Sequence, residues 1–416
     1  MSGIRVLALF PPAKGGREIA EYSFLTEEFR ALARRGITIV SISPQAPDTY
    51  QRDGVTIYAL PRGRDASWFL ANLRFALSSL PRFPWPQLWR FRDWYRVALI
   101  ERYAIEVARR EAVHLIHSTF AWPSGSAGML VQKTLGKPLL LSLRGADILT
   151  EPSVGYGSRR DGFYDALLRR SLHYADRITG NSCYVLEQAW QLGADRHKCM
   201  LVAKRVDTER FSPQVRGDDV HERLHARGRP IILSVRHLVP KNGLEHLIRA
   251  TRLLAAKVPD VLVVICGKGR EAYQEQLNAL VRDLGLQDHV RLAGLIPRHE
   301  IPAYFAACRV SVIPSLMEAA GNVILESMAC ARPVVGSRVG GIPEYIEDGV
   351  SGFLVEPGNP AALAERILRL LEDETLAQRM GQAARARVET HCRFDSMIEQ
   401  IEGLYHELAT LPARAG

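Results

Sequence analysis

Two series of short apolar runs, each alternating with helical segments, constrain the fold of this 416-residue chain more than any other feature. The first series comprises IRVLALF, ITIVSIS, VHLIHS and PLLLSL, and the second begins at PIILSV and includes VLVVICG and PVVGS. Continuous apolar strands separated by helices predict parallel sheets covered on both faces. The pattern therefore predicts an α/β fold of two Rossmann-like, doubly wound domains with a ligand cleft between the carboxyl ends of their strands.

The expected domain bounds follow from the same pattern. An N-terminal domain is expected over residues 1–212, and a polar stretch over 213–229 has the composition of a linker. The second domain is expected over 230–392, and an amphipathic helix in 393–416 is expected to pack back on the N-terminal domain.

Several classes of protein are excluded by composition and segments. No apolar run approaches the roughly 20 residues that a membrane-spanning helix needs. The opening Met1–Phe10 is too short for a signal segment and contains Arg5, so it is interpreted as a first strand. The cysteines form no CxxC pair, which predicts a reducing cytoplasm, no disulfide framework and no zinc site. They are Cys183, Cys199, Cys266, Cys308, Cys330 and Cys392.

The formal charge of +9 is unevenly distributed. Residues 1–210 hold 30 basic and 20 acidic side chains, whereas residues 211–416 hold 24 and 25. A basic half joined to a near-neutral half indicates an anionic partner for the first half, such as a phosphate-bearing molecule or a membrane surface.

The strongest local motif runs from Pro314 to Gly341. In it a strand leads through a turn with Gly321 into a helix beginning at Asn322, and a helix N-terminus is a ready phosphate site. Glu318 precedes this helix and Glu326 lies inside it, on the same face as Asn322 and about 6 Å further along the axis. A diphosphate at the helix start would therefore place its ribose near Glu326 and the sugar it carries near Glu318.

This motif, continued by Gly340–Gly341 and IPEYIEDGVSGFLVEPGNP, resembles the retaining glycosyltransferases of glycosyltransferase family 4. The resemblance covers nearly the whole chain and is strongest over 231–360. It implies the GT-B fold, with the donor site in the second domain. It also implies that Glu318 contacts the donor hexose, Glu326 the ribose and the amides near Gly321–Val323 the diphosphate.

In the family, an Arg and a Lys in the segment aligned with SVRHLVPKNG neutralise the departing diphosphate. Anchored on Gly243, those positions are His237 and Asn242 here, while Arg236 and Lys241 stand one residue earlier with the same five-residue spacing. Arg236 and Lys241 are therefore the expected catalytic cations.

The resemblance also marks candidates outside that segment. His117 is a candidate catalytic residue or, alternatively, a satisfied strand-end histidine, and Thr119 stands where the family often has a second histidine. Substitutions that add cations on the acceptor side imply an unusual or anionic acceptor. The candidate acceptor-side residues are Arg144, Asp147, Lys204 and Arg205, and the further donor-loop candidates are Gly15, Gly16 and Gly267.

A dinucleotide site is the main competing interpretation of the second series. VLVVICGKGREA contains the loose fingerprint Gly267-x-Gly269-x-x-Ala272 between a strand and a helix. In the glycosyltransferase family the same place carries a glycine loop beside the nucleotide, so the match does not require NAD.

A tryptophan-rich basic stretch occupies the middle of the first half. Trp68, Trp85, Trp89 and Trp94 fall within 27 residues, interleaved with arginines. Trp and Arg together suit an anionic lipid interface, and packing of the first domain's helices is the alternative. No nucleic-acid-binding module accompanies these cations, so nucleic acid is not expected as a partner.

Together these features predict a metal-independent retaining hexosyltransferase without a cofactor. Its donor is expected to be a UDP- or GDP-hexose and its acceptor a glycan or lipid-linked molecule, as in cell-surface polysaccharide or glycolipid synthesis. The expected location is the cytoplasm, with peripheral binding to the inner face of the cell membrane. The alternatives are a GT-B sugar-nucleotide epimerase and a non-catalytic nucleotide-sugar-binding protein.

Overall fold

The computed structural model describes residues 3–10, 23–43, 48–60, 66–79 and 90–412. The chain divides into two compact units. Unit 1 contains nearly all of the chain up to Val202 together with the segment from Ile398 onward, and the main part of unit 2 is Ala203–Met397.

Unit 1 is built on an eight-stranded sheet in the order β3-β4-β2-β1-β5-β6-β7-β8. Every neighbouring pair is parallel except β3 with β4. The strands are β1 (Arg5–Leu9), β2 (Thr38–Ser43), β3 (Tyr50–Arg52), β4 (Val55–Ala59), β5 (Leu115–Thr119), β6 (Leu139–Leu143), β7 (Arg177–Gly180) and β8 (Cys199–Leu201).

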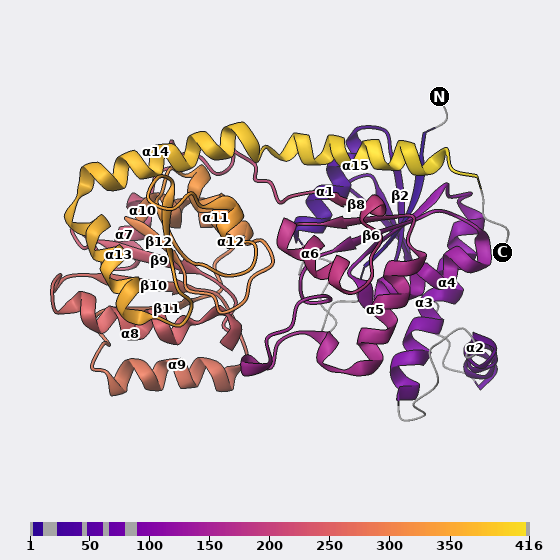
Figure 1. Ribbon diagram of the computed structural model, residues 1–416, viewed down its shortest axis with the longest axis horizontal. Coiled ribbons are helices and arrows are strands. Elements are labelled where there is room, and N and C mark those ends of the chain that lie inside the picture. The colour runs from indigo at the N-terminus through magenta and orange to yellow at the C-terminus, as the bar shows by residue number, and fades with distance from the viewer. Residues whose placement is uncertain (1–2, 11–22, 44–47, 61–65, 80–89, 413–416) are drawn as a thin grey trace. The chain divides into compact units, whose positions relative to one another are not determined.

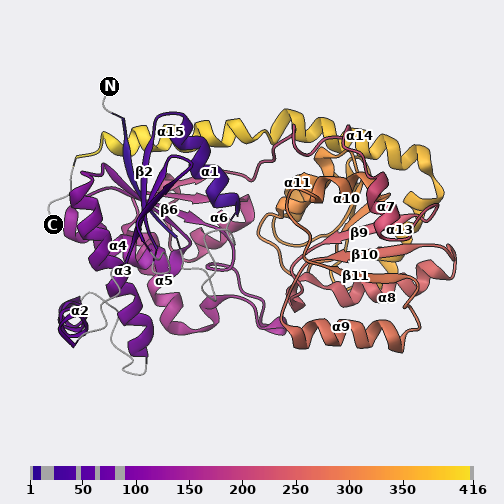
Figure 2. The same ribbon diagram turned by 180° about the vertical axis from the view of Figure 1, so that it is seen from behind.

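Helices cover both faces of this sheet (Figures 1 and 2). The helices are α1 (Ser23–Arg34), α2 (Ala66–Ser79), α3 (Phe91–Arg110), α4 (Ser126–Leu135), α5 (Gly162–Tyr174), α6 (Cys183–Gln191) and the C-terminal α15 (Phe394–Ala409). On one face lie α3, α4 and α5, and on the other lie α1 and α15, whereas α2 packs mainly on α3.

Unit 2 has a six-stranded, fully parallel sheet in the order β11-β10-β9-β12-β13-β14. Its strands are β9 (Ile231–Val235), β10 (Leu262–Cys266), β11 (Val290–Gly294), β12 (Val310–Ile313), β13 (Val334–Ser337) and β14 (Gly352–Val355). Its helices are α7 (Asp218–Arg223), α8 (Leu244–Ala255), α9 (Glu271–Asp283), α10 (Ile301–Ala307), α11 (Asn322–Ala329), α12 (Ile342–Tyr345), α13 (Pro360–Glu372) and α14 (Glu374–His391).

The continuous apolar runs of unit 2 arise because each strand serves two hydrophobic cores. Side chains of successive strand residues point to opposite faces. In β9, Ile232 lies in the core beneath α8 and α13, and its neighbours Ile231 and Leu233 lie in the core beneath α10 and α11. Both faces of the sheet are thus dry, and the predicted fold class of two doubly wound α/β domains is confirmed.

The stretch over 213–229 differs from the expected linker. It contains α7, and Val220, Leu224 and Ala226 are buried in the hydrophobic core of unit 2. The expected boundary at residue 212 also differs, because unit 2 already begins at Ala203. Polar residues dominate the stretch because a six-residue surface helix buries only one narrow face.

The C-terminal helix belongs to unit 1 from Ile398 onward. Its apolar face is fully used, since Ile401, Leu404, Tyr405 and Leu408 are all buried. Among the helices that the structure describes, none combines the length and apolar character needed to cross a bilayer.

Candidate active site

The candidate site of unit 2 lies where its sheet changes winding direction. From β9 the chain builds outward to β10 and β11, then returns to form β12, β13 and β14 on the other side of β9. Ligands of open parallel sheets bind at the carboxyl ends of the strands beside such a switch point. The segments that follow β9 and β12 carry Arg236, Lys241 and Glu318, which are three of the residues expected from the sequence.

Two backbone contacts hold these segments together. The amide of Leu316 donates to the carbonyl of Lys241 at 2.8 Å. Gly243 adopts φ 60°, and a Cβ at this position would lie 2.1 Å from the carbonyl oxygen of Pro314. The turn after β9 therefore fits against the loop after β12 only because residue 243 is glycine.

Arg236, Lys241 and Glu318 form one charge cluster, in which Arg236 is buried and the other two are slightly exposed. Arg236 Nη2 donates to Glu318 Oε2, and Lys241 Nζ lies 3.6 Å from the same oxygen. Arg236 also donates to Ser315 Oγ at 2.6 Å, and Lys241 to the carbonyl of Met317 at 3.2 Å. Two cations thus face one carboxylate, which gives the cluster a positive balance suited to an anionic ligand.

Asn242, which stands at the family's usual Lys position, aligns both cations. Its Oδ1 accepts Arg236 Nη2 at 2.9 Å and Lys241 Nζ at 3.0 Å, and its Nδ2 donates to the carbonyl of His237 at 2.7 Å. Asn242 is buried. Arg236 and Lys241 stand one residue earlier than the family's cations, and the side-chain amide of Asn242 fixes the positions of both.

The charges of the cluster set the ionisation of Glu318. Burial acts to raise its pKa, but the Lys241 ammonium and then the Arg236 guanidinium overcome that effect and lower the pKa to about 2. Burial lowers the pKa of Lys241, while Glu318 opposes that shift. Glu318 is therefore an ionised carboxylate throughout the neutral range.

The glycine pair after β13 positions Glu318 from the other side. Gly340 adopts φ 58°, and a Cβ there would lie 1.8 Å from the carbonyl oxygen of Glu318. The Gly341 amide donates to that same carbonyl at 3.2 Å. The segments that follow the neighbouring strands β9, β12 and β13 thus meet at Glu318.

Helix α11 begins next to this cluster. Gly321 caps it in a left-handed conformation (φ 84°), and no side chain caps the helix. The Ile324 amide donates to the carbonyl of Gly321 at 3.1 Å, whereas the first-turn amides of Asn322 and Val323 have no partner within the helix and are suited to an anion. Glu326 follows one turn later, and its Oε1 lies 4.0 Å from Arg298 Nη2.

Arg298 is a site residue that the sequence reasoning missed. It follows β11 by four residues and brings a cation to the expected ribose-binding carboxylate, Glu326. A basic residue shortly after the carboxyl end of a predicted strand was the available clue.

Gly267, expected to bind the donor, has a structural explanation of its own. A Cβ at this position would lie 1.8 Å from the carbonyl oxygen of Arg236, and the Gly267 amide donates to the carbonyl of Gly294 at 2.7 Å. Gly269 likewise approaches Leu238, with which it forms a β-bridge. The loose dinucleotide fingerprint therefore reflects close contact between two backbone segments, and Gly267 acts by letting the Arg236 segment approach.

His117 is not an accessible catalytic group, and that assignment is corrected. It is 1% exposed, its Nδ1 is 2.7 Å from Tyr405 Oη, and its Nε2 is 2.8 Å from Ser142 Oγ. A general acid or base must reach the substrate, and both ring nitrogens are occupied inside unit 1. The structure fits the alternative of a satisfied strand-end histidine. Thr119 is also buried and donates to the carbonyl of Leu9 at 3.2 Å.

Arg144 and Asp147 organise loops of unit 1, which corrects their assignment as acceptor contacts. Arg144 Nη2 donates to both carboxylate oxygens of buried Glu28, at 2.9 and 3.0 Å. Asp147 is buried and accepts the amides of Ala121 at 2.8 Å and Gly145 at 2.9 Å. These polar groups are committed to the fold of unit 1.

Lys204 and Arg205 lie in unit 2, not in the acceptor domain where they were expected. Lys204 is buried, and its amide donates to Tyr345 Oη at 3.2 Å. Arg205 donates to the carbonyl of Lys204 at 3.1 Å. The remaining candidates, Gly15 and Gly16, lie outside the described residues.

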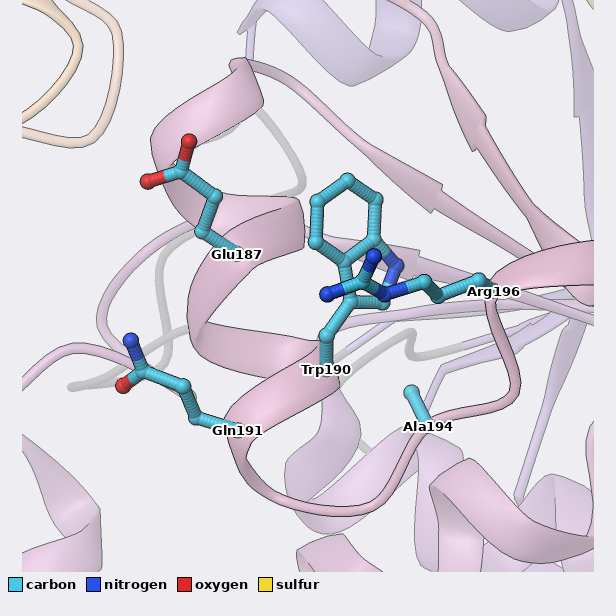
Figure 3. A pocket seen from close by; sticks show the side chains of 5 residues that line it. All are labelled: Glu187, Trp190, Gln191, Ala194 and Arg196. Atoms are coloured by element: carbon cyan, nitrogen blue, oxygen red, sulfur yellow. The ribbon is translucent and has the colours of Figure 1, made fainter.

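A separate pocket of about 400 Å³ opens in unit 1 at the end of α6 (Figure 3). It is lined by Glu187, Trp190, Gln191, Ala194 and Arg196, and the Arg196 guanidinium lies over the Trp190 ring, 4.8 Å from its centroid. None of its lining residues belongs to the set expected from the sequence.

The fold and the cluster together define a two-domain α/β protein with a candidate anion-binding site at the switch point of its second sheet. The profile of the family described as "Glycosyl transferases group 1" matches residues 216–387, and that of "Glycosyl transferase 4-like domain" matches residues 24–204.

Individual proteins agree with this match. The chain is 32% identical over 311 residues to D-inositol 3-phosphate glycosyltransferase of Acidothermus cellulolyticus, covering 70% of this chain and 67% of that protein. It is 26% identical over 316 residues to N-acetyl-alpha-D-glucosaminyl L-malate synthase of Bacillus anthracis, covering 76% and 80%. HepE of Anabaena, solved in complex with UDP-glucose, shares the fold with a TM-score of 0.76 at 19% identity, covering 97% of this chain and 100% of that one.

The chain belongs to the group 1 glycosyltransferases and has the GT-B fold. It is thus a glycosyltransferase, and the matches do not favour the epimerase alternative.

Proposed function

We propose that this protein is a retaining glycosyltransferase that transfers a hexose from a nucleotide-sugar to an anionic glycan or lipid-linked acceptor. The observation that carries the proposal is the cluster of Arg236, Lys241 and Glu318 beside the uncapped start of α11. Two cations and free first-turn amides are the groups that a departing nucleoside diphosphate requires.

In the proposed reaction the bond between the sugar C1 and the diphosphate oxygen breaks. A bond between C1 and the acceptor oxygen forms on the same face of the sugar, and the acceptor's hydroxyl proton passes to the departing diphosphate. Arg236 and Lys241 stabilise the charge that develops on the diphosphate, and the Glu318 carboxylate contacts the hexose. Because two protein cations neutralise the diphosphate, the reaction needs no metal, and we expect a chelator to leave turnover unchanged.

The donor assignment is supported by HepE, which shares the fold and was solved with UDP-glucose. An anionic acceptor is supported by the names of the two relatives, which specify inositol 3-phosphate and L-malate. Such acceptors fit a role in making glycolipids or cell-surface polysaccharides, at the inner face of the cell membrane when the acceptor is lipid-linked.

A panel of UDP- and GDP-hexoses tests the donor site. We expect one of them to bind and to be hydrolysed slowly without acceptor. Glu326→Ala should weaken its binding about tenfold or more, through loss of a hydrogen bond to a charged group. Glu347→Ala removes an exposed carboxylate of the same unit and is the matched control. If no member of the panel binds or is hydrolysed, the proposed function is wrong. Proton NMR of the first product reports whether the anomeric configuration is retained.

A further inference from the structure

Helices α2 and α3 of unit 1 carry an unusual concentration of exposed apolar side chains. Phe69, Leu70 and Leu77 of α2 are 48%, 54% and 50% exposed, and Phe91 at the start of α3 is 44% exposed. Leu70, Arg74 and Leu77 are spaced i, i+4, i+7 and therefore share one face of α2. Figures 1 and 2 both show α2 at the outer edge of its unit, beside α3. Exposed leucines on the outward face of a helix favour contact of that face with another surface.

The buried side of α2 is already accounted for by α3. Asn72 and Ala76 are buried, and Arg102 Nη1 of α3 donates to Asn72 Oδ1 at 2.7 Å. The two helices also share aromatic contacts, because the ring of Tyr95 lies 6.4 Å from that of Phe69 and 5.8 Å from that of Phe91. These contacts join Phe69 and Phe91 through the Tyr95 ring where α2 meets α3, and Leu70 and Leu77 lie on the outward face of α2.

The exposed charged side chains of α2 and of the start of α3 are positive. Arg74 is the single charged residue of α2, and Arg92 and Arg96 are exposed near the start of α3. Asp93 is engaged by Tyr164 Oη at 2.7 Å and by Arg90, and Glu101 is buried. Within the described residues, Arg74 and Arg92 form no ion pair.

We propose that this surface, consisting of Phe69, Leu70, Arg74, Leu77, Phe91, Arg92 and Arg96, docks on a bilayer containing anionic lipids. Leucine and phenylalanine enter the boundary of the acyl chains, and arginines at their edge meet lipid phosphates. A second copy of this chain is a poor occupant, because a symmetric contact would bring the same cations together. The inference deepens the proposed function by naming the membrane-facing surface, but its test does not depend on glycosyl transfer.

The test measures binding of the full chain to sedimenting vesicles of phosphatidylcholine, with and without phosphatidylglycerol. We expect binding to the anionic vesicles and little to the neutral ones. The double variant Leu70→Gln/Leu77→Gln should lower the partition coefficient at least about tenfold, because two apolar side chains no longer enter the bilayer. Arg74→Gln/Arg92→Gln should lower it about fivefold for each arginine at low ionic strength.

Matched controls are available in unit 2. Leu253 and Val350 are 49% and 48% exposed, and Arg252 and Arg282 are exposed cations. Leu253→Gln/Val350→Gln and Arg252→Gln/Arg282→Gln therefore repeat the loss of exposed apolar area and of charge at other places, and should bind vesicles as the parent protein does. Circular dichroism checks that every variant is folded.

Three results would overturn the inference. They are absence of binding to anionic vesicles, equal binding to both kinds of vesicle, and equal losses in the test and control variants. Concentration-dependent dimerisation that Leu70→Gln/Leu77→Gln abolishes, without vesicle binding, would assign the surface to a second copy. Donor hydrolysis in vesicle-free solution should be unchanged in both test variants, so failure of the proposed function is recognised separately.

Discussion

At the scale of single residues, the central feature is one carboxylate that pairs with two largely buried cations. Glu318 is ionised over the whole neutral range, and both Arg236 and Lys241 pair with it. Its negative charge therefore holds the two cations in place and at the same time repels the diphosphate that they are expected to bind.

Glu318→Gln separates these two effects. The neutral amide keeps the size of the side chain, so we expect turnover of the donor to fall by about 10²–10³ through loss of a transition-state contact. The nucleoside diphosphate should bind as tightly as before or more tightly, because Arg236 and Lys241 are released from their counter-ion. Steady-state kinetics and titration calorimetry measure the two quantities, and Glu347→Gln, an exposed carboxylate, is the control. Parallel losses of turnover and diphosphate affinity would contradict this account.

Single site residues could be predicted where a motif marks their chemistry, but not where burial by another segment decides what a side chain contacts. The structure brings Arg236, Lys241 and Glu318 together, because the segments after β9 and β12 meet at the switch point of the sheet, and their roles stay predictions. His117 was assigned wrongly because Tyr405, which occupies its Nδ1, comes from a helix 288 residues later. No local pattern around His117 contains that information.

At the scale of elements, the strands were predictable and the polar connections were not. Apolar runs such as Ile231–Val235 show in the sequence because both faces of the sheet are buried. Helix α7 did not show, because its short apolar set of Val220 and nearby Leu224 is outnumbered by charged neighbours. The role of the glycine turns was likewise hidden, since a close backbone approach leaves no trace beyond the glycine itself.

Gly340→Ala tests whether the turn after β13 positions Glu318. The new Cβ would collide with the Glu318 carbonyl, so we expect donor turnover to fall at least about tenfold as that segment is displaced. Gly349→Ala is the matched control, because residue 349 has φ 80° and no atom within 4 Å of the added Cβ. Both variants should lose about 1–2 kcal/mol of stability to the left-handed backbone. Equal turnover in the two variants, measured with the donor alone, would refute the positioning role.

At the scale of the whole molecule, the structure shows how the basic excess of residues 1–210 is divided. Some arginines of unit 1 form ion pairs within the fold, such as Arg144 with buried Glu28 and the partly exposed Arg90 with Asp161. Others, Arg74 and Arg92 among them, are exposed beside apolar side chains. The sequence predicts an anionic partner for the basic half, and that stays a prediction. Only the positions of the side chains separate the arginines that pair within the fold from those exposed to a ligand.

The burial of His117 beside Tyr405 also makes the stability of unit 1 dependent on pH. Burial lowers the pKa of His117 from 6.5 to about 4, so its neutral form is the one that the folded state accepts. Above pH 6.5 His117 is neutral in both the folded and the unfolded chain, so acid does not lower the free energy of unfolding through this residue. As the pH falls towards 4, His117 becomes protonated in the unfolded chain but stays neutral in the folded chain. This difference removes up to ~3 kcal/mol from the free energy of unfolding.

Chemical denaturation at pH 7.5 and at pH 4.5 measures this loss. His117→Gln keeps a polar side chain but cannot take up the proton, so its free energy of unfolding should fall less between the two pH values than that of the parent protein. The exposed His299 provides the control, because His299→Gln leaves the interior unchanged and should follow the parent protein. If His117→Gln and the parent protein lose the same free energy of unfolding on acidification, the proton that destabilises unit 1 binds elsewhere, and the contact between β5 and the C-terminal helix is insensitive to pH.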